Sequence, residues 1–286
     1  MQAKRSLLFI CFTVIIPSLV GCETSRHTKQ ADTREVVRKD ASLSLMTYNI
    51  RVGAGREKPL TPVKYLSSSR EKLEAIALAI KSVDADVIAL QEVRGSAQAK
   101  FLADTLNLNY AYVSHGDFRL EWGLAVLSKF SILEYYGKSI YHHGKKPRVG
   151  LVCLIDANNS PITVINVHYN LGAYAEQVEA TVELLQGVNG PVILMGDLNL
   201  INPTRGLVPI RTKLIDTCEA VNTKGSQEAR QRGTYKFSSR RLDYIFVDPN
   251  QFVVIDAGLA PETYRRASDH IAYFAWVTPK NGESAP

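Results

Sequence analysis

Polar side chains suited to acid, base or metal chemistry recur along the chain at the ends of apolar runs. They are Asn49, Glu92, His168, Asp197 with Asn199, Asp243, and Asp269 with His270. An apolar run of this kind is typical of a buried strand, and strand ends are where a rigid scaffold presents reactive groups. Each position alone is a weak signal, since Asp-x-Asn is usually a turn and Asp-His a common surface pair. Their recurrence in order indicates one assembled catalytic site.

The elements that must hold these side chains follow from the spacing of apolar residues. Strands are expected over residues 43–50, 85–90, 110–114, 122–127, 151–155, 162–167, 192–195, 242–247, 252–257 and 271–277. Helices are expected over 67–83, 97–106 and 175–187. So many strands with so few helices favour two packed sheets with helices on the outside.

Residues 1–22 have the layout of an export signal, in which Lys4 and Arg5 precede an apolar run and Leu-Val-Gly-Cys ends at Cys22. The run is too short to span a membrane. The last four residues resemble a bacterial lipobox, which implies cleavage before Cys22 and lipidation of that cysteine. Glu23 then points to the outer membrane of a Gram-negative cell, with the rest of the chain in the periplasm or outside. The alternative is an ordinary secretory signal with an incidental cysteine.

The remaining chain divides by composition into a tether and one domain. Residues 23–42 are polar, of mixed charge and without apolar periodicity, which suits a flexible tether. Residues 43–286 contain no low-complexity break and no repeat, so we expect one large α/β domain. Without the two leader cations and the single net positive charge of the tether, the formal +6 of the chain falls to +3. So small an excess neither favours nor excludes a nucleic-acid partner.

Four cysteines are too few for a disulfide framework. Cys11 lies in the leader and Cys22 in the lipobox, which leaves Cys153 and Cys218 for at most one bridge. Cys153 lies in an apolar run and is expected in the core. No cluster of cysteine and histidine has the spacing of a zinc site.

Seven motifs together resemble the endonuclease/exonuclease/phosphatase superfamily, which includes deoxyribonuclease I, exonuclease III-type repair enzymes, neutral sphingomyelinases and inositol-polyphosphate 5-phosphatases. The motifs are MTYNIR at 46–51, DVIALQEVR at 86–94, GLAVLS at 123–128, NVH at 166–168, GDLN at 196–199, RLDYIF at 241–246 and SDH at 268–270. The resemblance spans residues 43 to 278 and implies an α/β (α+β) fold, a four-layer α-β-β-α sandwich.

The resemblance also implies a divalent metal, Mg2+ or Mn2+. Glu92 would be its principal ligand, with Asn49 and Asp269 nearby, and such oxygen ligands suit a metal that keeps several waters. Phosphodiester hydrolysis needs charge neutralisation, an activated water and help for the leaving oxygen. Asp197 would help to activate the water, and Asn199 would hold the phosphate. The alternative for Glu92 is a salt-bridged carboxylate at a strand end.

Two histidines have acid–base roles in the deoxyribonuclease I-like members. Each is oriented by a carboxylate that fixes its tautomer and raises its pKa. By position, Asp243 would pair with His270 and Glu121 with His168. Glu121 has an equally good alternative as an ordinary exposed acid in a turn.

Two arginines, Arg51 and Arg94, match arginines that touch the DNA backbone and minor groove in deoxyribonuclease I. The guanidinium fork suits both contacts, although members of other specificity carry the same motifs and bind other phosphates. Asn170 and Arg148 are further candidates for substrate-phosphate binding. Arg119 stands where the pancreatic-type nuclease has a tyrosine that stacks on the sugar, so the resemblance fails at that contact.

The function expected from these features is that of a metal-dependent phosphodiester hydrolase, a deoxyribonuclease I-like endonuclease tethered to a membrane by a lipid anchor. DNA is the expected substrate, no protein partner is indicated, and we expect a monomer. A phospholipid phosphodiesterase of the sphingomyelinase kind and a small-phosphoester phosphatase are alternatives. A non-catalytic binding module is a further one, although it would be expected to have lost at least one of Glu92, Asp197, Asp243, Asp269 or His270.

Overall fold

The computed structural model describes residues 42–55, 68–116, 122–142, 147–200 and 203–280. By its contacts the chain divides into two units, Met1–Arg38 and Lys39–Pro286. All described residues belong to the second unit, which contains every strand and helix named below. Among the described residues, no helix has both the length and the hydropathy needed to cross a bilayer.

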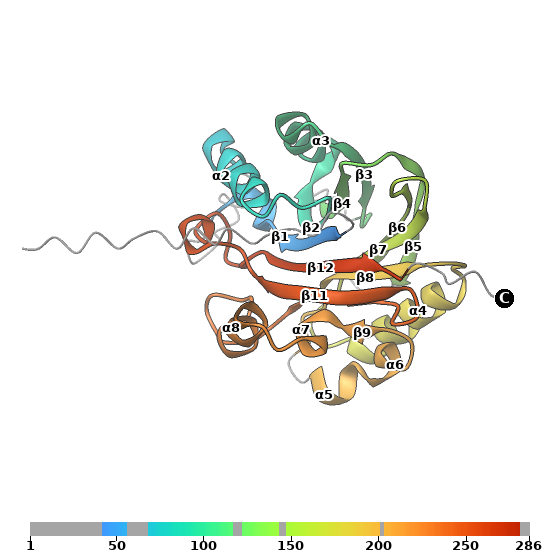
Figure 1. Cartoon of the computed structure of the whole chain (residues 1–286). Helices are drawn as coiled ribbons and strands as arrows, with labels where there is room; N and C mark the ends of the chain where they lie inside the picture. The colour runs from blue at the N-terminus through green and yellow to red at the C-terminus, as the bar shows by residue number, and fades with distance from the viewer. Residues whose placement is uncertain (1–41, 56–67, 117–121, 143–146, 201–202, 281–286) are drawn as a thin grey trace, which may run out of the picture. The chain divides into compact units, whose positions relative to one another are not determined.

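Two six-stranded mixed sheets form the centre of the domain (Figure 1). The first has the order β11-β12-β1-β2-β4-β3, comprising β1 (Leu43–Asn49), β2 (Val87–Arg94), β3 (Asn109–Ser114), β4 (Trp122–Ser128), β11 (Phe252–Leu259) and β12 (Tyr273–Pro279). The second has the order β5-β6-β7-β8-β10-β9, comprising β5 (Ile132–Tyr141), β6 (Arg148–Asp156), β7 (Pro161–His168), β8 (Val192–Asp197), β9 (Ile215–Asp216) and β10 (Asp243–Val247). Within them, β1–β2 and β7–β8 are parallel pairs.

Helices cover the outer faces of both sheets. The first sheet carries α2 (Arg70–Lys81) and α3 (Gly95–Leu106), and the second carries α4 (Tyr174–Gln186) and α6 (Val208–Arg211). The remaining short elements are η1 (Arg51–Gly53), α5 (Pro203–Gly206), α7 (Thr217–Ala220), α8 (Lys224–Arg232) and η2 (Glu262–Tyr264). The four layers confirm the sandwich that the sequence predicts.

The alternation of side chains along each strand divides the core into three apolar clusters. In β1, Leu43 and Leu45 pack between the two sheets, whereas Met46 and Tyr48 pack under the helices of the first sheet. Successive side chains of a strand point to opposite faces, and in this strand both faces are covered. This explains why the strands read as continuous apolar runs, and why those runs predict strands so directly.

Helix α2 shows how the sequence sets an outer layer. Ser69 caps its first turn by accepting a hydrogen bond from the backbone N–H of Lys72, at 3.3 Å. Leu73, Ile76 and Ile80 then recur at helical spacing and are buried against the first sheet. The expected helices over 67–83, 97–106 and 175–187 all form, with slightly different ends.

Besides the short elements β9, α5, α6, α7, η1 and η2, two longer elements were not expected from the sequence. Strand β5 is an edge strand that lacks a buried stripe, and Leu133 and Tyr135 are each more than half exposed. Helix α8 has the sequence KGSQEARQR, which contains no apolar periodicity, and its cap is Thr223, which accepts from the backbone N–H of Ser226. Apolar spacing finds elements that face a core, so it misses both.

Both cysteines of the domain are buried, and neither forms a disulfide. Cys153 and Cys218 are free thiols at 0% exposure. Cys153 packs between the sheets, as the sequence predicts.

The topology brings the predicted site residues together. Parallel strands β1 and β2 end with Asn49 paired to Gln91, and parallel strands β7 and β8 end with His168 paired to Asp197. Strand β10 runs the other way and begins at Asp243, again opposite Asp197. The predicted site residues of both sheets therefore lie at one edge of the sandwich.

Candidate active site

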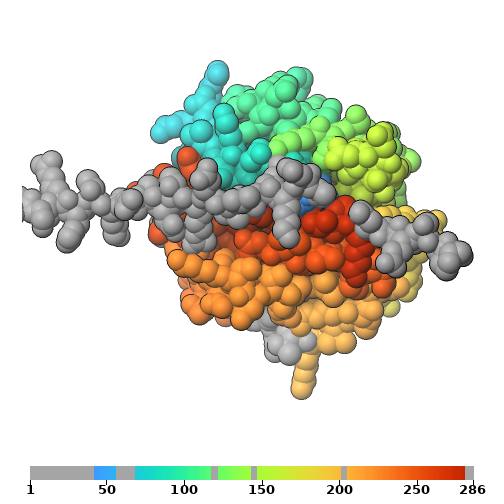
Figure 2. All heavy atoms as spheres, viewed as in Figure 1, coloured from blue at the N-terminus to red at the C-terminus, as the bar shows by residue number. Residues whose placement is uncertain are grey.

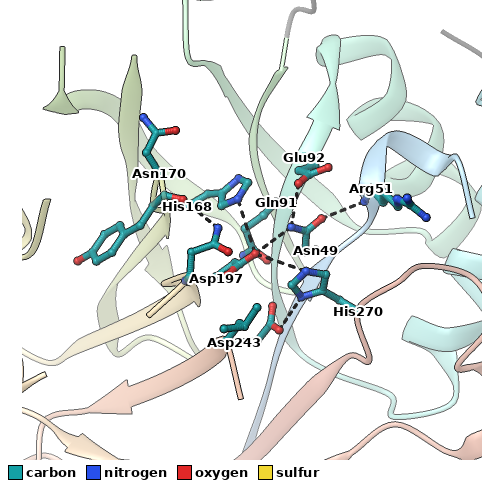
Figure 3. A network of polar contacts seen from close by, with 12 residues as sticks. Asn49, Arg51, Gln91, Glu92, His168, Asn170, Asp197, Asp243 and His270 are labelled. Carbon is teal, nitrogen blue, oxygen red and sulfur yellow. Dashed lines mark hydrogen bonds and ion pairs between the residues drawn. The ribbon is translucent and has the colours of Figure 1, made fainter. Parts of the chain in front are cut away.

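Asp197, Asp243 and His270 form the buried centre of the site (Figure 3). The Nδ1 atom of His270 lies 2.8 Å from Oδ2 of Asp243, and its Nε2 atom lies 3.7 Å from Oδ2 of Asp197. Because Nδ1 faces a carboxylate, it carries a proton and donates. The Ser268 hydroxyl helps to place the histidine, since it accepts from the backbone N–H of His270 and donates to the backbone oxygen of Asn49. The predicted pair of Asp243 with His270 is present.

Neighbouring charges and burial shift the protonation of His270 and Asp197. Burial lowers the pKa of His270, but the carboxylates of Asp243 and Asp197 outweigh it and raise that pKa to about 10. Burial raises the pKa of Asp197 to about 7; His270 opposes this rise and Asp243 adds to it. At neutral pH His270 is therefore a cation, and Asp197 lies close to its own titration.

Asn49 connects the centre to Glu92. Its amide nitrogen donates to Oε1 of Glu92 at 3.2 Å and to Oδ2 of Asp197 at 3.0 Å. Its amide oxygen accepts from the backbone N–H of Arg51 at 3.0 Å. The nitrogen rather than the oxygen thus faces the carboxylates, so direct metal ligation by Asn49 requires its amide to turn over.

Glu92 occupies a β-bulge. The pairing of β2 with β4 shifts register between Leu90 and Val93, and Glu92 lies inside the shift with a φ of 54°. Arg51 and Asn199 also have positive φ, at 49° and 48°. A left-handed backbone is unfavourable for such residues, and conformations of this kind cluster at functional sites.

The donors around Glu92 suit a divalent metal. Burial raises the pKa of Glu92, and the carboxylate of Asp269 raises it further, whereas Asn49 lowers it. A divalent cation between these two acids would relieve both effects, and carboxylate oxygens are the ligands that Mg2+ and Mn2+ prefer. Asp197, Asp243 and His270 are a second possible metal group, with one ligand atom each within 4.8 Å of one another.

His168 is the second histidine of the site. Its Nε2 atom lies 3.6 Å from Oδ2 of Asp197, beyond a hydrogen bond. Burial lowers the pKa of His168 well below its ordinary value, and Arg148 and His115 lower it further. The expectation that a carboxylate orients His168 and raises its pKa stays a prediction. Glu121, the expected partner, lies outside the described residues.

The predicted phosphate-binding residues lie on opposite sides of the centre, with Arg51 on the Glu92 side and Asn170 on the His168 side (Figure 3). Arg51 is 5% exposed, lies 3.2 Å from Asp269, and donates to the backbone oxygen of Gly55 at 2.8 Å. Arg148 is buried at the start of β6, and its charge acts on both His168 and Glu92. Arg94 ends β2 and is partly buried.

Asn199 and Asn170 are anchored by the loops that follow the strands. Asn199 donates its side-chain amide to the backbone oxygen of Tyr169 at 2.9 Å, and its backbone N–H donates to Oδ1 of Asp197. The backbone of Asn170 accepts from, and donates to, the side chain of Gln177 in α4. Both asparagines are thus held beside His168 and Asp197.

The sequence did not single out two amides that join the sheets beneath the site. Gln91 donates to Oδ1 of Asn166 at 2.8 Å, and Asn166 donates to the backbone oxygens of Leu90 and Ala125, both at 2.9 Å. Gln91 and Asn166 are 0% exposed. An amide at the end of an otherwise apolar strand run is the signal that could have found them.

The family model described as "Endonuclease/Exonuclease/phosphatase family" matches residues 46–270. The chain is 27% identical over 214 residues to the uncharacterized protein YbhP of Escherichia coli, covering 67% of this chain and 83% of that protein. It is 25% identical over 268 residues to an inositol phosphosphingolipids phospholipase C of Saccharomyces cerevisiae, covering 71% of this chain and 55% of that protein.

Among solved structures, a functionally unknown conserved protein from Enterococcus faecalis V583 superposes with a TM-score of 0.69 at 22% identity, covering 83% of this chain and all of that one. That likeness concerns the fold. With the family model matched over most of the domain and the motif residues assembled at one edge of the sandwich, the chain belongs to the endonuclease/exonuclease/phosphatase family, whose members are generally phosphoester hydrolases.

Proposed function

We propose that this protein is a metal-dependent phosphodiesterase that uses Mg2+ or Mn2+. The observation that carries the proposal is His270, held as a cation between the carboxylates of Asp243 and Asp197. A buried cation beside a carboxylate that titrates near neutrality provides both an electrophile for the phosphate and a base for water.

The residues divide the hydrolysis between them. Asp197 takes a proton from the attacking water, whose oxygen bonds to phosphorus as the bond from phosphorus to the leaving oxygen breaks. The His270 cation gives its Nε2 proton to the leaving oxygen, while Asp243 holds its Nδ1 proton. Asn199 and the neutral His168 donate to the phosphate from the other side. A divalent metal would be held by Glu92 and Asp269 and would supply charge neutralisation.

DNA is the first substrate that we propose. Arg94 and Arg148 lie on separate strands that lead to the site, and guanidinium groups suit phosphate oxygens. The guanidinium of Arg51 pairs with Asp269 and donates to the backbone oxygen of Gly55, which holds it beside the Glu92 side of the site.

A phospholipid is the second candidate, and two observations favour it. The relative from Saccharomyces cerevisiae is named as a phospholipase C. Leu171, directly after Asn170 beside the site, is 71% exposed, which suits contact with a lipid surface. A lipid anchor on Cys22, proposed from the sequence, would also hold the domain near a membrane.

The test compares three substrates with the full-length chain in Mg2+ or Mn2+: supercoiled plasmid DNA, sphingomyelin vesicles and bis-p-nitrophenyl phosphate. Glu92→Ala is the inactive control, and Glu74→Ala, at an exposed acid of α2, is the matched surface control. We expect plasmid nicking that requires metal, is lost in Glu92→Ala and persists in Glu74→Ala. Release from sphingomyelin without nicking would favour the phospholipid, and inactivity on all three substrates would contradict the proposed function.

A further inference from the structure

His115 is a buried histidine beside the site that no motif singles out. It directly follows β3, where its backbone N–H donates to the backbone oxygen of Trp122 at 2.8 Å. Its side chain is 3% exposed, and its ring centroid lies 6.3 Å from that of His168. His115 thus lies between the start of β4 and β6, with the His168 ring as its neighbour. His115 and His168 are 3% and 2% exposed, so both rings lie beneath the outer surface that Figure 2 draws.

The tautomer of His115 follows from the hydrogen bond that its ring accepts. The backbone N–H of Val149 donates to Nδ1 of His115 at 3.1 Å, so Nδ1 carries no proton. Burial, with a smaller contribution from Arg148, lowers the pKa of His115 to about 3, which keeps the ring neutral. The single ring proton is thus on Nε2, a buried donor that has no hydrogen-bond partner among the described residues.

His168 presents the complementary atom. Its Nε2 atom faces the carboxylate of Asp197 at 3.6 Å, which favours the proton on Nε2. Nδ1 is then an acceptor, and among the described residues, which do not include Glu121, this buried atom has no hydrogen-bond partner. Buried polar atoms are nearly always hydrogen-bonded, and in this pair an unmatched donor and an unmatched acceptor belong to neighbouring rings.

We propose that His115 is a positioning residue for His168. Its Nε2–H donates through one water molecule to Nδ1 of His168 and so keeps the His168 proton on Nε2, pointed at Asp197 and the phosphate. A centroid separation of 6.3 Å exceeds that of two directly hydrogen-bonded imidazoles and suits one bridging water. The inference rests on the proposed function only for the catalytic use of His168, because the tautomers are independent of any substrate.

The consequence is a division of labour between the two histidines. Nδ1 of His270 donates to the carboxylate of Asp243, whereas Nδ1 of His168 accepts from a neutral donor through water. His168 then contributes a hydrogen bond to the substrate rather than a positive charge.

The first test is the ring tautomer itself, read from long-range nitrogen–proton NMR spectra of the full chain labelled with 15N-histidine. The chain has six histidines, so assignment by single substitution is practical. We expect both His115 and His168 as neutral rings protonated on Nε2. A His168 ring protonated on Nδ1, or on both nitrogens, would overturn the proposal.

The second test uses two variants that separate positioning from packing. His115→Asn keeps an acceptor for the backbone N–H of Val149 but has no donor in the place of the His115 Nε2–H. His115→Gln supplies an amide N–H in that place. In His115→Asn we expect the His168 signals to shift toward a mixture of tautomers and kcat to fall about tenfold with little change in KM. In His115→Gln we expect the Nε2 tautomer of His168 and the kcat of the parent to return for the most part.

The two readouts also separate this proposal from the proposed function. If the His168 tautomer changes with residue 115 but the chain shows no phosphodiesterase activity, the positioning role is supported and the proposed function is contradicted. An unchanged His168 spectrum in His115→Asn would overturn the positioning role whatever the activity.

Discussion

At the scale of single residues, two histidines face the same carboxylate oxygen and differ in charge. The Nε2 atoms of His168 and His270 lie 3.6 Å and 3.7 Å from Oδ2 of Asp197. Their other ring nitrogens decide the difference, because Nδ1 of His270 meets Asp243, whereas Nδ1 of His168 meets no carboxylate among the described residues. A charge-assisted hydrogen bond stabilises the cation, and burial without one stabilises the neutral ring.

This arrangement predicts a bell-shaped dependence of kcat/KM on pH. Asp197 must be ionised to accept a proton, so activity rises as the pH passes its pKa of about 7. His270 has a raised pKa of about 10, so its cation is present below that pH and is lost above it, and activity falls. In Asp243→Asn the cation loses its main partner, and the falling limb should move to lower pH. If kcat/KM of that variant falls at the same pH as in the parent, the group that titrates at high pH is not His270.

Metal binding is expected to depend on Glu92. Chelation should abolish hydrolysis, and Mg2+ or Mn2+ should restore it. Glu92→Gln keeps the shape of the side chain but removes its charge, so we expect the affinity for Mn2+ to fall at least about tenfold by isothermal titration calorimetry. The matched control is Glu74→Gln, which changes an exposed acid of α2. Equal affinity in Glu92→Gln and the parent would remove Glu92 as the principal ligand.

At the scale of elements, the strand ends are fixed by amides that join the two sheets. Asn166 in β7 donates to backbone oxygens of β2 and β4 and accepts from Gln91 in β2. Glu92 comes directly after Gln91, and His168 lies two residues after Asn166. These hydrogen bonds therefore hold the Glu92 bulge and the His168 strand in register with each other.

Replacing Asn166 should cost stability. Asn166→Leu removes three buried hydrogen bonds, among them one of those that the Gln91 amide donates. We expect this to lower the free energy of unfolding by about 2 to 4 kcal/mol. Urea denaturation followed by circular dichroism measures the change, with the exposed Asn250→Leu as the control. A loss no larger than that of the control would show that the amides contribute little.

At the scale of the whole molecule, the sandwich was predictable because its strands are covered on both faces, as Leu45 and Met46 of β1 illustrate. The edge strand β5 was not, since Tyr135 and Tyr136 are about half exposed and leave no apolar stripe. The motifs placed Asp243 beside His270. The neutral state of His168 depends on His115 and Arg148, which approach it only in the folded chain.

The placement of the molecule in the cell stays a prediction from the sequence. If Cys22 is lipidated, the full chain expressed in a Gram-negative host should fractionate with membranes, and Cys22→Ala should appear in the soluble fraction or as an uncleaved precursor. Labelling with a radioactive fatty acid measures the modification directly. A parent chain that takes up no label would contradict the lipid anchor while leaving the catalytic domain as described.

The most direct test of the hydrolytic centre is turnover of bis-p-nitrophenyl phosphate by His270→Ala at saturating Mg2+ or Mn2+. His142→Ala, at an exposed histidine, serves as the matched control. We predict that His270→Ala lowers kcat about 100-fold or more, as expected for loss of an acid–base group, while it keeps the parent's circular dichroism spectrum and the control keeps parent activity. A folded His270→Ala protein with the parent's kcat would contradict the assignment of Asp243, His270 and Asp197 as the catalytic centre.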